Sequence, residues 1–166
     1  EANALMDRWQ DVLVGIGNPA NQDVEDCISA ISVHSYVRPA WSRWIVEGIR
    51  EFLSRNGWRS DVDIWITESG IQSKERPGYH PDKGPYYSNA AQASYVMQQY
   101  ALAMQGMTNV GRPDGLIFHH RLRDEAYNPD TQLGDGTYGL LRESDNAPWP
   151  SYYAAWLITQ KLEATS

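Results

Sequence analysis

The sequence predicts an α/β fold in which parallel strands alternate with helices. Four short apolar segments have the character of buried strands, and helical patterns lie between and after them. The two long polar loops both follow strands, which is typical of α/β barrels, whose sites lie at the carboxyl ends of strands, although a doubly wound open sheet would share this feature in part. At 166 residues the chain is too short for a complete eight-stranded barrel. We therefore expect residues 1–166 to form one domain, or part of a larger one.

The first two predicted strands differ in pattern. Residues 11–16 (DVLVGI) form a short apolar run that a Gly-Asn-Pro sequence closes, as at the end of a buried strand. Residues 27–36 (CISAISVHSY) alternate, which places small and polar side chains on one face. His34 and Tyr36 belong to that face.

The third and fourth predicted strands both end in polar residues. Residues 63–67 (DIWIT) form the third strand, which delivers Glu68 to its carboxyl end. Strict alternation would place Glu68 on the same face as Ile64 and Ile66. Residues 115–119 (GLIFH) form the fourth strand, and a long polar loop follows it.

Three helices are predicted from apolar residues at helical spacing. The first begins after Pro39, the second begins after the N-cap Ser88 and ends before Gly106, and the third follows Pro150. The side chains expected to face inward are Trp41, Trp44, Ile45, Ile49, Phe52 and Leu53 in the first helix, Ala93, Val96, Met97, Tyr100, Ala101 and Met104 in the second, and Tyr153, Trp156 and Leu157 in the third.

Composition argues against several classes of function. A formal charge of -7 without any Lys/Arg cluster argues against nucleic acid as a partner. No run approaches the length of a membrane span, so we expect no membrane partner. Cys27 is alone, so neither an intrachain disulfide nor a cysteine-based zinc site can form. Because the chain begins with Glu1, we expect a processed or truncated piece whose targeting signal, if it has one, lies outside it.

The strongest chemical signal is Glu68 in the run WITESG, where a strand ends in a carboxylate and then breaks at glycine. His34 and Tyr36 lie two residues apart on the preceding strand, so both can meet this carboxylate on the same face. A tyrosine hydroxyl that donates to the carboxylate keeps it ionised and oriented, as a nucleophile requires. Taken alone, Glu68 could equally cap a helix or form a surface salt bridge, but its combination with His34 and Tyr36 favours a catalytic site.

The run ISVHSYVRP, a helix, DIWITESG, a helix that opens with SNAAQASYV, and then GLIFHHR resembles the last strands of the clan A glycoside hydrolases. These enzymes are (β/α)8 TIM barrels in which the seventh strand ends in the nucleophilic Glu and the sixth often carries a His-x-Tyr pair. The resemblance implies that the chain is the C-terminal half of such a barrel, strands five to eight. It also implies that Glu68 is the nucleophile, with Tyr36 and His34 as its catalytic neighbours.

The resemblance further implies a retaining glycoside hydrolase that acts on O-glycosidic bonds of an oligo- or polysaccharide, and we expect neither a cofactor nor a metal. A second carboxyl about 5 Å from Glu68 would protonate the leaving oxygen. The acid/base motif of the clan, a Glu preceded by Asn, is absent from this sequence. We therefore expect the N-terminal half of the barrel, or a second copy of the chain, as a partner. The same resemblance favours a secreted or periplasmic protein.

Contacts with a carbohydrate substrate are expected at the end of the fourth predicted strand and in the loop after it. Many clan members carry a Trp there, whereas this chain has a His-His-Arg sequence. Adjacent strand residues point to opposite faces, so we expect one histidine of the pair to reach the site. The expected substrate-binding residues are His119, His120, Arg121, Arg123, Asp124 and Trp149, with Tyr138 as a further candidate for a sugar platform.

Other interpretations of the sequence stay open. A G-x-G-x-x-A pattern begins at Gly15 and could bind a pyrophosphate, but Pro19 removes a backbone donor there. The residues His34, His80, His119, His120, Asp124 and Glu125 could be pooled into a metal site, but no spacing orders them on one face. A non-catalytic carbohydrate-binding or assembly module is the alternative to an enzyme.

Overall fold

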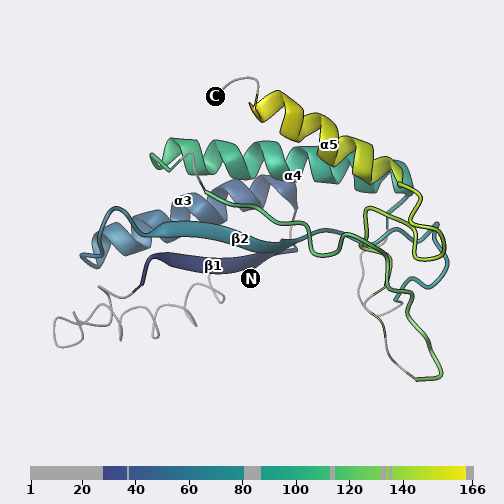
Figure 1. Ribbon diagram of the computed structural model, residues 1–166. Coiled ribbons are helices and arrows are strands. Elements are labelled where there is room, and N and C mark those ends of the chain that lie inside the picture. The colour runs from purple at the N-terminus through teal and green to yellow at the C-terminus, as the bar shows by residue number, and fades with distance from the viewer. Residues whose placement is uncertain are drawn as a thin grey trace.

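The computed structural model describes residues 28–36, 38–80, 87–112, 115–131, 134 and 136–163. Two parallel strands, β1 (Ala30–Ser35) and β2 (Asp63–Ser69), form its sheet. The helices α3 (Pro39–Arg55), α4 (Asn89–Asn109) and α5 (Pro150–Glu163) lie on one side of this sheet, and α4 packs against both of the others (Figure 1). No helix in the described part of the chain is both long enough and apolar enough to cross a membrane.

The predicted half-barrel of four strands is wrong for the part of the chain that the structure describes. The first predicted strand, residues 11–16, lies outside the described residues. The fourth, residues 115–119, runs beside β2 but forms only a single parallel bridge, between Ile66 and Ile117. The backbone N–H of Phe118 donates to the oxygen of Ile66 at 2.8 Å, and that of His120 donates to the oxygen of Ser69 at 2.8 Å, so the segment follows β2 without forming a regular strand. The described fold is a small α/β unit of two strands and three helices.

The irregularity in β2 determines which way Glu68 points. Val33 of β1 lies opposite Ile66, but the next residue, His34, lies opposite Glu68, so Thr67 is an extra residue in β2. Paired residues of parallel strands point to the same side of the sheet. Glu68 therefore faces the side of His34, and its predicted place on the buried side of Ile66 is wrong. A β-bulge re-aims side chains in this way and often lies beside a functional site.

The main hydrophobic core lies between the sheet and the helices α3 and α4. Its buried residues are Ile31, Val46, Ile49, Leu53, Trp58, Val62, Ile64, Ile66, Ala103 and Met107. The helix α4 does not end before Gly106, as predicted, but continues to Asn109. A side chain at Gly106 would approach the backbone oxygen of Arg43 in α3 to 3.0 Å. This glycine therefore allows the two helices to pack closely and is not a helix stop.

The helices bury the expected faces only in part: Ile49 and Leu53 of α3 and Val96 and Tyr100 of α4 are buried as predicted. In α5 the residues predicted to face inward are exposed, namely Tyr153 (57%), Trp156 (55%) and Leu157 (42%). The small residues Ser151, Ala154 and Ala155 are buried instead, because small side chains let α5 lie close to α4. Trp44 of α3 is likewise exposed. In α4 Met97 and Ala101 are exposed, whereas the polar side chains of Gln92 and Gln99 are buried.

Candidate functional site

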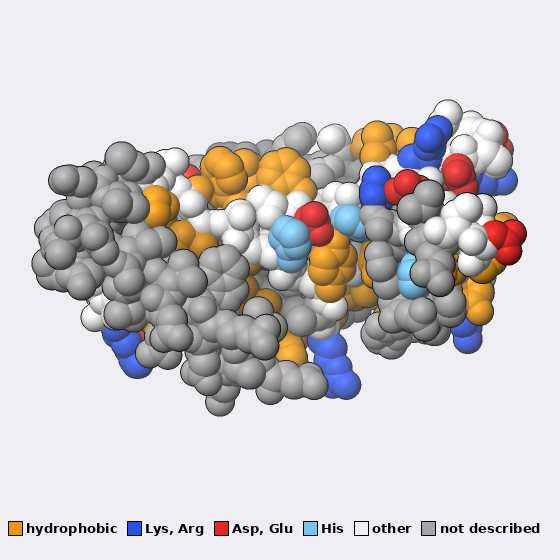
Figure 2. Space-filling view, turned by 90° about the horizontal axis from the view of Figure 1, so that it is seen from below, with side chains coloured by type: hydrophobic (Ala, Val, Ile, Leu, Met, Phe, Trp, Pro, Cys, Tyr) orange, Lys and Arg blue, Asp and Glu red, His pale blue; other side chains and the backbone are white. Residues whose placement is uncertain are grey.

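The Glu68 carboxylate lies at the carboxyl end of β2, with three side chains around one of its oxygens. Tyr36 Oη donates to Glu68 Oε2 at 2.6 Å, and Nδ1 of His34 lies 3.2 Å from the same oxygen. Nδ1 of His120 lies 3.5 Å from it. We call His34, Tyr36, Glu68 and His120 the glutamate cluster. Figure 2 shows the molecule from the side of the sheet opposite α3, α4 and α5, where histidine side chains lie next to an acidic one.

The glutamate cluster leaves one carboxylate oxygen available. All three contacts reach Oε2, and Oε1 makes no hydrogen bond or ion pair with any residue that the structure describes. The Glu68 side chain is 35% exposed, so solvent or a ligand can approach it. A carboxylate that is held by one oxygen and open at the other is suited to attack an electrophilic carbon.

Buried polar residues fix the end of β1 from the helix side. Ser35, between His34 and Tyr36, has its hydroxyl 2.8 Å from that of Ser42 in α3. Nε2 of Gln99 in α4 donates to Ser35 Oγ at 3.1 Å. Ser42 and Gln99 were not identified from the sequence. The pattern that could have indicated them is a Ser or Gln at a helix position where the buried face would otherwise be apolar.

The two adjacent histidines point in different directions. His120 faces Glu68, whereas Nε2 of His119 lies 2.7 Å from the backbone oxygen of Tyr138. Gly70 makes room for this arrangement, because a side chain there would approach His119 and Tyr138 to 3.3 Å. The Tyr138 side chain is itself buried, so its exposed area is too small for a sugar platform.

Burial lowers the pKa of His119 to about 4, and the carbonyl of Tyr138 only partly opposes this shift. In the unfolded chain the His119 ring binds a proton near pH 6.5. Between pH 6.5 and 4 this ring is therefore protonated more often in the unfolded chain than in the folded chain. We therefore expect the free energy of unfolding to fall by on the order of 2 kcal/mol as the pH falls through this window. Urea unfolding at pH 4.5, 5.5 and 7 measures the slope.

The control for this slope is His119→Gln, which removes the titrating ring but keeps an amide that can donate to a carbonyl. We expect the variant to lose most of the pH dependence between pH 6.5 and 4. An equal slope in the variant and the parent chain would contradict the assignment, because other groups would then cause it.

Asp124, predicted to bind substrate, belongs to a buried ion pair. Nη1 of Arg76 lies 3.2 Å from Asp124 Oδ1, and the backbone N–H of Gly139 donates to the same oxygen at 2.7 Å. Trp149 Nε1 donates to Asp124 Oδ2 at 2.7 Å. Burial lowers the pKa of Arg76 to about 10 and raises that of Asp124, while the attraction between the two opposes both shifts.

Further contacts of Arg76 involve Trp149 and several acceptors. We call Arg76, Asp124 and the residues that contact them the buried network. The Arg76 guanidinium lies 4.3 Å from the centroid of the Trp149 ring, and that of Arg142 lies 5.3 Å from it. Trp149 therefore packs against cations, so the ring is engaged within the protein. The other groups that accept from Arg76 are Asn89 Oδ1, Gln92 Oε1, Gly139 O and Ser151 Oγ.

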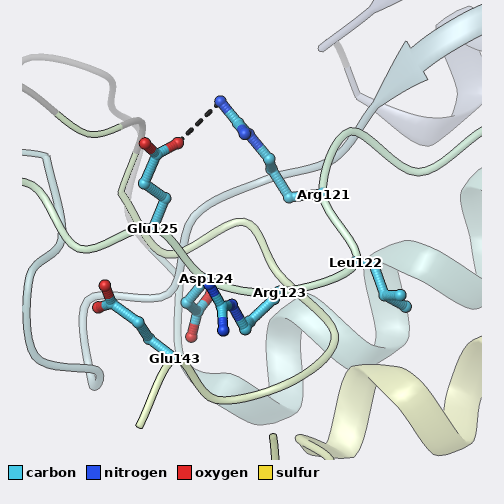
Figure 3. Close-up of a pocket in the computed structure, with 6 residues that line it drawn as sticks. All are labelled: Arg121, Leu122, Arg123, Asp124, Glu125 and Glu143. Atoms are coloured by element: carbon cyan, nitrogen blue, oxygen red, sulfur yellow. Dashed lines mark ion pairs between the residues drawn. The ribbon is translucent and has the colours of Figure 1, made fainter.

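Arg121 and Arg123 lie on the loop that continues from the glutamate cluster. They line an open depression of about 410 Å³, together with Leu122, Asp124, Glu125 and Glu143 (Figure 3). Arg121 Nη2 lies 2.8 Å from Glu125 Oε2, as the dashed line in Figure 3 marks.

The structure thus brings His34, Tyr36 and His120 to Glu68, whereas Asp124 and Trp149 lie in the buried network. Within the described residues, no group of three or more His, Cys, Asp and Glu side chains is arranged to hold a metal ion.

No family model matches the chain, and no curated protein sequence matches it. Its structure is similar to the GH2 beta-galacturonidase from Eisenbergiella tayi bound to galacturonate (TM-score 0.55, 14% identity, covering 80% of this chain and 24% of that chain). It is also similar to the beta-glucuronidases of Ruminococcus gnavus (0.52, 13%, 81% and 22%) and Faecalibacterium prausnitzii (0.50, 13%, 84% and 22%). The fold is glycosidase-like. At these identities the likeness concerns the fold alone, and the chain spans about a quarter of the length of these enzymes.

These comparisons correct the identification drawn from the sequence. The chain was expected to be the C-terminal half of a clan A glycoside hydrolase, and that identification is wrong as it stands, because the solved structures that the chain resembles match it only weakly and in fold alone. The comparisons support instead a weak likeness in fold to a GH2 beta-galacturonidase and to beta-glucuronidases.

Proposed function

We propose that the chain carries the nucleophile of a retaining glycoside hydrolase, and that this nucleophile is Glu68. The observation that carries the proposal is the glutamate cluster, in which three side chains orient Oε2 and leave Oε1 without a partner among the described residues. Tyr36 acts as the principal donor, since its hydroxyl lies 2.6 Å from the carboxylate. His34 and His120 add donors on either side when their Nδ1 atoms are protonated.

In the proposed reaction Oε1 of Glu68 attacks the anomeric carbon of a bound glycoside. A C–O bond to Glu68 forms as the bond to the leaving oxygen breaks, and the leaving oxygen takes a proton from an acid. Water then attacks the same carbon and returns the free carboxylate. We assign this acid to polypeptide outside the described residues. Tyr36 would keep the carboxylate ionised before attack and stabilise it again when the ester is cleaved.

The likeness in fold to glycoside hydrolases supports the reaction class, although its low identity carries no substrate over to this chain. Within the proposal the substrate is a carbohydrate, and the loop that begins at His120 and lines the depression would contact it. Arg121 and Arg123, which line this depression, would be the cationic side chains that bind its hydroxyl or carboxylate groups.

The experiment that tests this function is covalent labelling with a panel of 2-deoxy-2-fluoro glycosyl fluorides. These reagents need little acid assistance, because fluoride is a good leaving group, so the first step does not depend on the acid. We expect a mass increase of one fluoro sugar, located by peptide mapping on Glu68. Labelling at another residue, or none with any sugar of the panel, would overturn the proposal.

A second candidate is a non-catalytic carbohydrate-binding or assembly module. The observation that favours it is the exposure of large apolar side chains, which are Leu116, Phe118, Leu122, Tyr153, Trp156 and Leu157. In this case the chain would self-associate or bind an oligosaccharide without forming a covalent adduct. Light scattering together with the labelling panel separates the two functions, since a monomer that is labelled at Glu68 excludes the second.

A further inference from the structure

We propose that Tyr138 is a positioning residue, which holds Tyr36 and His120 in place around Glu68. This inference rests on the proposed function of Glu68. Tyr138 comes from the loop that follows residue 120, far along the chain from the strands that carry Tyr36 and Glu68. Its side chain is buried, and its ring contacts two of the three side chains around the carboxylate.

The ring contacts of Tyr138 have a defined geometry. The Tyr138 and Tyr36 centroids lie 5.7 Å apart with an interplanar angle of 71°, and the Tyr138 and His120 centroids lie 5.2 Å apart at 87°. Tyr36 and His120 are also 5.5 Å apart at 80°. Three rings in edge-to-face contact restrict one another, because each fills space into which the next would otherwise turn. Tyr138 therefore limits the rotamers of both donors.

The backbone around Tyr138 is fixed by buried groups. The backbone oxygen of Tyr138 lies 2.7 Å from Nε2 of His119. The backbone N–H of Gly139 donates to Asp124, and the backbone oxygen of Gly139 accepts from Arg76. On the other side, Nε2 of Gln92 donates to the oxygen of Thr137 at 3.1 Å. A fixed backbone and a buried side chain together restrict the rotamers that the Tyr138 ring can adopt. The buried network thus supports the glutamate cluster through Tyr138.

The test compares two replacements of Tyr138 of different character. Tyr138→Phe keeps the ring and loses the hydroxyl, whereas Tyr138→Met keeps an apolar side chain of similar size and loses the ring. With the fluoro sugar that labels the parent chain, we expect Tyr138→Met to lower the maximal rate of labelling about tenfold. We expect the half-saturating concentration to change less than about twofold, and Tyr138→Phe to remain near the parent values. Tyr153→Leu, on the exposed face of α5, is the control.

A second readout separates this inference from the proposed function. NMR of the histidine ring protons reports the aromatic neighbours of His120 without any reaction. We expect these shifts to move in Tyr138→Met and to stay in Tyr138→Phe, at a temperature where both variants are folded. If the parent chain is never labelled, the proposed function fails, and unchanged shifts in Tyr138→Met would then overturn the positioning role as well. Equal labelling rates and equal shifts in all variants would overturn it alone.

Discussion

Replacing Glu68 by Gln should abolish covalent labelling by any fluoro sugar that labels the parent chain, with a loss of rate of at least about 10³-fold. The amide has the size and shape of the carboxylate and can still accept a hydrogen bond from Tyr36, so the fold should survive. It carries no negative charge, however, and its oxygen is too weak a nucleophile to attack the anomeric carbon. Intact-protein mass spectrometry over time gives the rate of labelling.

The matched control is Glu51→Gln, which makes the same substitution at an exposed glutamate of α3 that pairs with Arg55. We expect its labelling rate to equal that of the parent chain. Labelling of Glu68→Gln at the parent rate would show that another residue accepts the sugar. Tyr36→Phe should lower the labelling rate less than Glu68→Gln does, because it removes the 2.6 Å hydrogen bond and leaves the carboxylate in place.

Local sequence patterns predict the elements that carry the glutamate cluster well. The strand β1 lies within the predicted residues 27–36, β2 begins at the predicted Asp63, and α3 begins at Pro39. The predicted N-cap of α4 is confirmed, since Ser88 Oγ accepts from the backbone N–H of Ala91 at 3.0 Å. These features depend on residues close in sequence, whose preferences the pattern records directly.

The direction of Glu68 could not be predicted, because alternation alone gives no sign of the extra residue at Thr67. The buried polar residues of α4 and the buried face of α5 were missed for a related reason. Gln92 and Gln99 of α4 are buried because they bond to groups distant in sequence, such as the oxygen of Ile71 and the hydroxyl of Ser35. A helical pattern read by hydrophobicity assigns such residues to the surface.

Replacing Arg76 by Met should destabilise the fold by about 3–5 kcal/mol, because it leaves the Asp124 carboxylate buried without its counter-charge. The exposed fractions of Arg76 and Asp124 are 2% and 6%, so water cannot compensate for the loss. Urea unfolding followed by circular dichroism measures the change. The control is Arg55→Met, whose exposed ion pair with Glu51 should contribute less than about 1 kcal/mol. A loss below about 1 kcal/mol in Arg76→Met would contradict the role of the ion pair.

The pH dependence of the Arg76→Met variant distinguishes a lost charge partner from lost packing. Burial already raises the pKa of Asp124, and Arg76 opposes that shift, so its removal should raise this pKa further. When the pKa of an acid is higher in the folded than in the unfolded chain, the free energy of unfolding falls as the pH rises above the pKa of that acid in the unfolded chain, near 4. The loss of unfolding free energy in Arg76→Met, relative to the parent chain, should therefore be smaller at pH 4.5 than at pH 7.5. Adding Asp124→Leu should restore part of the stability at pH 7.5, and a deficit that is constant with pH would indicate packing instead.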